Sequence, residues 1–147
     1  MNREIKFRGY NYQYEKWFYG SLFIQKYDNG LTLSNLRTMI IDDRGYSVMV
    51  NNDTIGQYTG LKDKNGVEVY EGDIVRYYHK TFFKKKGEEV FDFKNEKCYV
   101  VWDIEGACFI LNKRKDKVTN KAYIDILDMS ESNNIEIIGN IYENEVD

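Results

Sequence analysis

The chain contains no proline, so its turns have to be shaped by glycine, asparagine or aspartate, and this restricts the possible fold. Between these turn residues lie short runs rich in aromatic and branched side chains, with thirteen Tyr and eight Phe in the whole chain. Such side chains pack well on a pleated, half-buried sheet. With 147 residues and 42% hydrophobic content, the chain can bury a core without disulfides. We therefore expect a mainly β protein with at most one or two short helices.

The N-terminal part of the chain predicts a β-rich segment. Residues 5–8 alternate apolar and charged side chains, and residues 17–24 form a second apolar run, so together they predict a hairpin. Asn-Gly at residues 29–30 indicates a turn. Apolar residues recur at helical spacing in residues 33–40, which predicts a short helix, whereas residues 46–50 alternate as a strand.

The C-terminal part contains five short runs of β type separated by polar segments, namely residues 74–78, 97–102, 108–112, 123–127 and 135–142. Five short strands fit a small SH3-like barrel, because closing the sheet removes most exposed edges. Gly139 marks the expected bend or bulge, and residues 79–96 read as a long loop. We place a boundary near residues 60–66. It separates an N-terminal β-rich segment, residues 1–60, from a C-terminal SH3-like barrel, residues 61–147, unless both pack as a single domain.

The ends and the cysteines of the chain carry no secretion signature. The N-terminus lacks an apolar run of signal-peptide length, and no eighteen apolar residues follow one another, so we expect a cytoplasmic protein without a membrane anchor. Cys98 and Cys108 each lie in an apolar run, where a cysteine usually serves as a small buried hydrophobe.

Charge is unevenly distributed along the chain. Residues 74–121 carry twelve Lys and Arg against seven Asp and Glu, whereas residues 122–147 carry seven acids and no base. Cations bind phosphates and aromatic faces stack on unpaired bases, so the basic and aromatic segments 77–86 and 113–117 predict a nucleic-acid-binding surface. Its candidate residues are Tyr77, Tyr78, Lys80, Lys84, Lys85, Lys86, Lys113, Arg114 and Lys115. The alternative is a pair of solvated loops whose charge is partly cancelled by nearby acids.

Other chemistry has weaker support. A calcium loop with Gly66 at its sixth position would have Leu61 at the first and Gly72 at the twelfth, so the first and last ligands are missing. His79 is the single histidine and has no partner that the sequence can name. The carboxylates of Glu68, Glu71 and Asp73 could serve a metal-assisted hydrolase, but an aspartate after Gly72 more simply binds backbone amides in a turn.

Three stretches of the chain resemble the YopX family of phage and prophage proteins. They are residues 5–9 with 17–20, residues 54–75, and residues 135–144. The resemblance implies a phage or prophage source in Gram-positive bacteria, a C-terminal SH3-type barrel and action in the host cytoplasm. It implies no catalytic residue. Relatives often carry proline after the closing Tyr-Glu-Asn, where this chain has Glu145.

Taken together, the residues favour a non-enzymatic binding or self-assembling module without cofactor or metal. Nucleic-acid binding is the first alternative, and a metal-assisted hydrolase is the second. The partners expected are further copies of the chain, a host or phage protein, or nucleic acid, and no membrane.

Overall fold

The computed structural model describes residues 4–26, 36–86, 88–113, 124–125 and 134–143. The chain divides into two compact units, Met1–Gly60 and Leu61–Asp147. The described residues form antiparallel strands and one short 3-10 helix, η1 (Asn52–Thr54), but no α-helix. The expectation of a mainly β protein is therefore confirmed. No helix in the described part of the chain is long and apolar enough to cross a membrane.

A six-stranded sheet has the strand order β4-β3-β2-β1-β5-β6, and its first five strands in chain order begin in the first unit. These five strands are β1 (Phe7–Asn11), β2 (Lys16–Lys26), β3 (Leu36–Ile41), β4 (Ser47–Met49) and β5 (Gly56–Lys62). The predicted hairpin is confirmed, because β1 and β2 pair from Phe7 opposite Gly20 to Asn11 opposite Lys16. The predicted strand at residues 46–50 is confirmed as β4.

The short helix predicted for residues 33–40 is wrong for its described part, which forms β3. Strand β2 offers β3 a continuous edge, from Ser21 opposite Ile41 to Lys26 opposite Leu36. Thr38 and Ile40 are buried, so burial follows the two-residue period of a strand. The helical spacing of a short apolar run was ambiguous, and sheet pairing decided its conformation. The Asn-Gly turn at residues 29–30 lies outside the described residues.

A cation and aromatic rings pack together on the first unit. The guanidinium of Arg8, which is buried, lies over the Trp17 ring at 4.5 Å from its centroid. Tyr10 meets the same indole edge to face at 5.3 Å. The Tyr10 amide donates to the hydroxyl of Thr54 at 2.8 Å, which fixes η1 beside β1. These contacts come from residues on both strands of the first hairpin and stabilise its pairing.

The second unit contains the five-stranded sheet β10-β9-β8-β7-β11, preceded by the short strand β6 (Glu68–Tyr70). The five strands are β7 (Asp73–Lys85), β8 (Glu88–Asp103), β9 (Cys108–Asn112), β10 (Ile124–Asp125) and β11 (Ile135–Asn140). The core cluster of the second unit comprises Val69 from β6 together with Val75, Cys98, Val100, Phe109, Leu111 and Ile135 from the five-stranded sheet. Each of the five predicted β runs coincides with a strand, although the run 123–127 is described only at Ile124–Asp125 and the last strand ends at Asn140. The bulge expected at Gly139 is confirmed by a register shift between Ile137 and Gly139.

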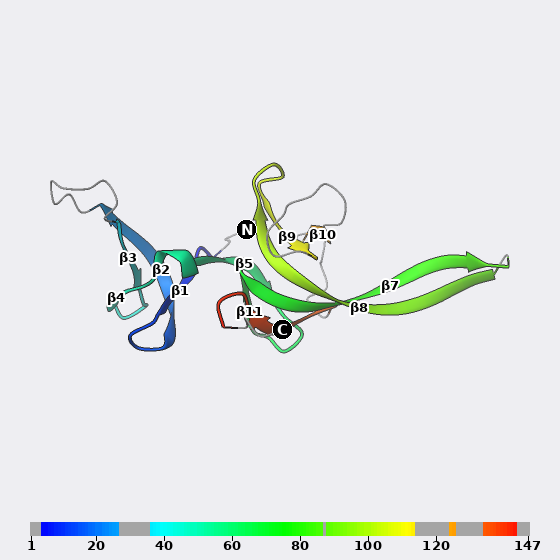
Figure 1. Ribbon diagram of the computed structural model, residues 1–147, viewed down its shortest axis with the longest axis horizontal. Helices are drawn as coiled ribbons and strands as arrows, with labels where there is room; N and C mark the ends of the chain where they lie inside the picture. Colours follow the sequence, from blue (N-terminus) through cyan, green and yellow to red (C-terminus); the bar gives the residue numbers. More distant parts are fainter. Residues whose placement is uncertain (1–3, 27–35, 87, 114–123, 126–133, 144–147) are drawn as a thin grey trace. The chain divides into compact units, whose positions relative to one another are not determined.

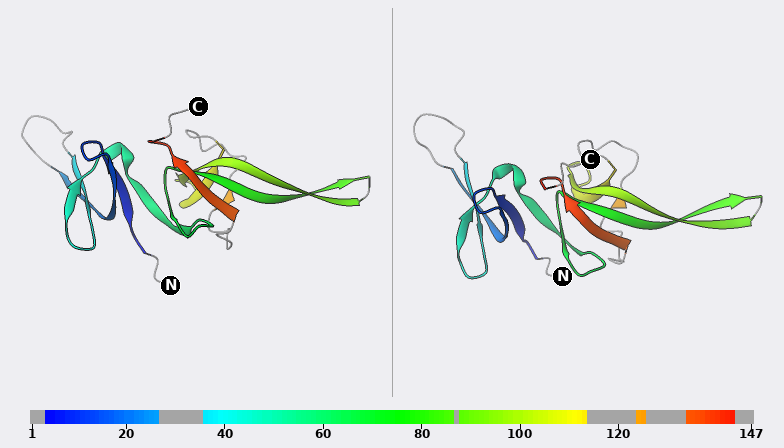
Figure 2. Two further views of the ribbon diagram at one scale, coloured as in Figure 1. Left: turned by 90° about the horizontal axis from the view of Figure 1, so that it is seen from below. Right: turned by 60° about the horizontal axis from the view of Figure 1, so that its bottom comes forward.

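The SH3-like barrel is not confirmed, because the described strands form an open sheet and no closed barrel. The long loop expected at residues 79–96 is also wrong. β7 and β8 pair continuously from Ile74 opposite Tyr99 to Lys85 opposite Glu88. Polar residues in this segment suggested a loop, but backbone pairing between β7 and β8 makes it a hairpin. Figures 1 and 2 show the hairpin extending past the other strands of its unit.

A turn at Asp63–Gly66 connects β5 to β6 and holds β11. The Gly66 amide donates to the Asp63 carbonyl oxygen at 2.9 Å and so closes the turn. Gly66 has a φ of 81°, which glycine adopts without strain. The buried carboxylate of Asp63 accepts from the amides of Asn65 at 2.8 Å, Val67 at 2.9 Å and Ile137 at 3.2 Å. The turn near the predicted boundary at residues 60–66 is thus also attached to the last strand through Ile137.

Candidate nucleic-acid interface

The basic and aromatic segment 77–86 lies on β7 and its turn, not in a loop. Successive residues of a strand point to opposite faces, so this segment is divided between two surfaces. Lys84 and Lys85 lie opposite Glu89 and Glu88 in the hairpin register. The cancelling charges noticed in the sequence are therefore cross-strand partners, which lowers the net charge at the end of the hairpin.

Tyr77 and Tyr78 illustrate this division. Tyr77 packs against the core cluster of the second unit, and burial raises the pKa of its hydroxyl, with smaller contributions from Cys98 and Glu96. The Tyr78 hydroxyl instead donates to Glu136 Oε2 at 2.8 Å on the opposite face. Of the two predicted tyrosines, only Tyr78 is therefore placed to stack on a ligand at the outer face.

The outer face at the base of the hairpin carries cations and aromatic rings from both strands. We call it the basic-aromatic face, and it comprises Arg76, Tyr78, Lys80, Phe93, Asn95 and Lys97. Arg76 lies directly opposite Lys97, and Lys80 lies opposite Phe93. The Lys80 ammonium is 5.7 Å from the centroid of the Phe93 ring, which is 80% exposed. Like charges directly opposite one another destabilise a sheet, and the Glu136 carboxylate offsets part of this repulsion at 3.9 Å from Arg76.

Sequence reasoning missed Arg76, Phe93 and Lys97, although it identified Tyr78 and Lys80. The missing signal is the hairpin register, because these residues come from two strands that only pairing brings together. The one hint in the sequence is the alternation of side-chain type along the segments that form β7 and β8, which is typical of strands.

Glu136 organises the edge of this face. Its Oε2 receives the Lys64 ammonium at 2.9 Å and lies 3.9 Å from a guanidinium nitrogen of Arg76. The hydrogen bonds from Lys64 and Tyr78 hold the pKa of Glu136 below its usual range. The Lys64 ammonium also lies 5.0 Å from the Tyr78 ring centroid. One carboxylate thus fixes a tyrosine and two cations in place.

A shallow hollow of about 530 Å³ adjoins the basic-aromatic face. It is lined by Tyr77, Tyr78, Lys80, Phe93, Lys94, Asn95 and Asn134. Asn134 precedes β11, which pairs with β7 only as far as Tyr77. The hollow therefore lies where β7 loses its neighbour and the hairpin begins.

Among the other predicted residues, those that the structure describes do not extend this surface. The Lys113 ammonium pairs with Glu96 at 2.8 Å, so its charge is already matched. Arg114 and Lys115 lie outside the described residues. Lys86 is exposed at the hairpin turn with a φ of 53°, and His79 lies opposite Lys94 in the register.

The carboxylates proposed for a hydrolase have structural partners. An oxygen of Asp73 accepts from the Tyr70 amide at 2.8 Å, and Glu68 accepts from the Tyr70 hydroxyl at 2.7 Å. Among the described residues, no group of three or more His, Cys, Asp or Glu could hold a metal ion. Asp73 thus has the turn-stabilising geometry that the sequence favoured, and it does not form a metal site with Glu68 and Glu71.

The cysteines show no reactive arrangement in the described part of the chain. Both are free thiols, and burial raises the pKa of Cys98 to about 11. Such a thiol stays protonated near neutral pH and is a poor nucleophile. Cys98 belongs to the core cluster, as the sequence suggested.

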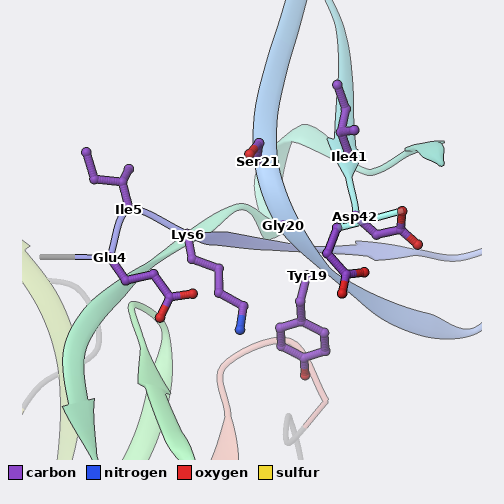
Figure 3. A pocket seen from close by; sticks show the side chains of 9 residues that line it. Glu4, Ile5, Lys6, Tyr19, Gly20, Ser21, Ile41 and Asp42 are labelled. Carbon is purple, nitrogen blue, oxygen red and sulfur yellow. The ribbon is translucent and has the colours of Figure 1, made fainter. Parts of the chain in front are cut away.

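The first unit contains a separate hollow of about 450 Å³ (Figure 3). The side chains of Glu4, Lys6 and Tyr19 project to the same side of the strands there. Asp42 also lines it, but its Oδ1 accepts from the amides of Arg44 at 3.0 Å and Tyr46 at 2.8 Å. Its role is therefore to shape the β3–β4 turn, and no sequence prediction fell on this hollow.

The fold and the site together define a mainly β protein with an extended hairpin and a basic-aromatic sheet face. Residues 6–146 match the family described as YopX protein, and the chain belongs to this family. It is also similar to the crystal structure of protein EF1440 from Enterococcus faecalis, with 23% identity and a TM-score of 0.48. That similarity covers 97% of this chain and 96% of the other. Comparison with curated proteins gave no match.

Proposed function

We propose that this protein is a non-enzymatic module that binds single-stranded nucleic acid on its basic-aromatic face. The observation that carries the proposal is the gathering of cations and an exposed ring on one face: Lys97 lies opposite Arg76 across β7 and β8, and Lys80 lies over Phe93. Phosphates of a bound strand would contact these cations, with Arg76 shared between the strand and Glu136, and the exposed Phe93 ring supplies a surface on which an unpaired base stacks.

The family membership supports a second part of the proposal, which concerns where the protein acts. The resemblance that identifies the YopX family implies a phage or prophage origin and the cytoplasm of the bacterial host. Single-stranded nucleic acid is exposed there during replication and transcription, so the proposed ligand and location are compatible.

Charge removal at the central rung tests the electrostatic part. In Arg76→Gln/Lys97→Gln, we expect weaker binding of a fluorescent single-stranded oligonucleotide at low salt. The slope of log K against log salt should fall by about 1.4, since each lost phosphate contact on a single strand contributes about 0.7. Fluorescence anisotropy over a salt series measures both quantities.

The matched control is Lys16→Gln/Arg44→Gln, which removes one lysine and one arginine from exposed positions of the first unit. It should leave the salt slope of the wild-type protein almost unchanged. No binding by the wild-type chain at low salt would refute the proposal, and so would equal slopes for the two double variants.

Removal of the exposed ring tests the stacking part. Phe93→Ala should weaken single-strand binding about tenfold or more, because stacking on an aromatic side chain contributes about 1–3 kcal/mol per base. Its effect on the salt slope should be small, since no cation is lost. Tyr46→Ala, at a 70% exposed ring in the first unit, is the control. Equal anisotropy titrations of the two variants would exclude a stacking role for Phe93.

A further inference from the structure

The distal part of the β7–β8 hairpin has two strand edges that pair with nothing in the described chain. β11 covers β7 only as far as Tyr77, and β9 covers β8 only from Tyr99 onward. The rungs from Tyr78 opposite Asn95 to Lys85 opposite Glu88 therefore form a two-stranded ribbon. We call this ribbon the arm, and Figures 1 and 2 show it clear of the other strands of its unit.

Such a ribbon is a template for another strand. Isolated two-stranded hairpins are marginally stable, and open edges present unpaired backbone donors and acceptors. A second copy of the chain can pair with the arm through a two-fold axis perpendicular to the sheet. The arms then point in opposite directions, and one residue lies opposite its own copy at the centre.

The β7 edge is poorly suited to this pairing. A register centred on Phe82 places Lys80 opposite Lys84 of the other copy, and one centred on Phe83 places Lys80 opposite Lys86. Like charges facing each other destabilise a strand pair. A centre nearer the base would bring the turn of the other copy against the part of β7 that β11 already covers.

The β8 edge offers one complementary register. Centred on Phe91, it places Glu88 of each copy opposite Lys94 of the other, so two opposite-charge pairs form by symmetry. The overlap ends before Tyr99, where β9 begins to occupy the edge.

Neighbouring registers on β8 lack this complementarity. A register centred on Val90 places Glu88 of one copy opposite Asp92 of the other. A register centred on Asp92 places Glu88 opposite Glu96, and Asp92 opposite Asp92 of the other copy. A register centred closer to the base of the hairpin would bring the turn of the other copy into contact with β9. Charge thus excludes the registers centred on Val90 and Asp92. A register centred on Phe93 would pair Asp92 with Lys94 and Glu89 with Lys97, but it is excluded because the turn of the other copy would meet β9 at Tyr99.

We infer that the arm is a dimerisation element, in which the β8 edges of two copies pair antiparallel about Phe91 into a four-stranded sheet. The Glu88–Lys94 pairs between copies set its register. The paired segment includes Phe93 of the basic-aromatic face but not the Arg76–Lys97 rung, and nuclease treatment removes any bound nucleic acid before the mass is measured.

Charge complementation tests the inference. Nuclease-treated wild-type protein should reach twice the chain mass of 17.5 kDa in size-exclusion chromatography with light scattering over a micromolar concentration series. Glu88→Lys and Lys94→Glu should each weaken dimerisation about tenfold or more, because each turns both pairs into like-charge pairs. An equimolar mixture of the two variants should recover the dimer, since opposite charges then face each other again. The double variant Glu88→Lys/Lys94→Glu should recover it as well.

The mixture separates loss of the interface from damage to the arm, because a misfolded arm would not be rescued. Glu105→Lys, an exposed change in the turn after β8, is the control and should leave the dimer unaffected. The inference is overturned by a wild-type chain that stays monomeric throughout the series. Dimerisation unaltered in both single variants, or single variants that fail to complement each other, would overturn it too.

Discussion

Asp63→Ala is expected to destabilise the second unit by about 3 kcal/mol. The carboxylate accepts amide hydrogen bonds from Asn65, Val67 and Ile137, and the last of these joins the turn to β11. Alanine would leave those amides without their acceptor in a buried position, and hydrogen bonds to a charged group typically contribute about 1.5–3 kcal/mol each. The loss should be smaller than the sum of the three hydrogen-bond contributions, because water can occupy part of the vacated site and accept from the amides. Urea denaturation measures the loss.

The pH dependence of this loss follows from the ionisation of Asp63. Burial alone would raise the pKa of Asp63, but the hydrogen bonds from Val67, Ile137 and Asn65 outweigh it and hold the pKa below the ordinary 3.8. A lowered folded-state pKa stabilises the protein above the unfolded value, and this contribution disappears as pH falls through the folded value. The stability difference between wild type and Asp63→Ala should therefore be full at pH 7 and smaller below pH 3.8.

Asp43→Ala, at an exposed position in a turn of the first unit, is the control and should change stability by less than about 0.5 kcal/mol. Asp63→Asn keeps one oxygen acceptor, so its stability should lie between those of the wild type and Asp63→Ala. If Asp63→Ala were as stable as the control variant, the turn would not clamp β11.

Gly20→Ala is expected to destabilise the first unit by about 3 kcal/mol or more. A Cβ at this position would lie 2.0 Å from the Ile41 carbonyl oxygen and 2.8 Å from its carbon. Both are backbone atoms of β3, which cannot rotate away as a flexible side chain can. The added methyl group must therefore separate β2 from β3. Amide hydrogen exchange should show faster exchange in β3 and unchanged exchange in the core of the second unit.

Gly45→Asn is the control for this substitution. Gly45 also has a positive φ, 85°, but a Cβ there meets nothing within 4 Å, and asparagine tolerates this backbone conformation. We expect a change within about 1 kcal/mol. Equal stability losses at the two glycines would show that backbone conformation matters here and the contact with Ile41 does not.

Much of the fold could be predicted from local pattern. The first hairpin, the strand at β4 and the five C-terminal β runs were all recoverable, because alternation and turn residues act over a few positions. The prediction of a helix at residues 33–40 was wrong for the described residues, because a short apolar run fits both the helical and the strand period. Pairing with β2 decided for the strand. The prediction of an SH3-like barrel was not confirmed, because strand lengths alone do not specify whether a sheet closes.

The candidate site was only half predictable. A run of lysines and aromatic residues was visible in the sequence, but strand alternation sends Tyr77 into the core and Tyr78 outward. Pairing with β8 then matches the distal lysines with glutamates and adds Phe93 and Lys97 to the outer face. Neither effect can be read from composition, because each depends on which residue lies opposite which.

The sequence by itself determined the class of this protein, its family and the places where the chain turns, since these depend on side-chain chemistry over short distances. Only the tertiary structure decided that the polar segment after Tyr78 is a paired hairpin, and that Asp63 reaches Ile137 far along the chain. The physical reason is the same in both cases. Backbone hydrogen bonds between distant segments fix the register, and the register determines which charges and rings share a face.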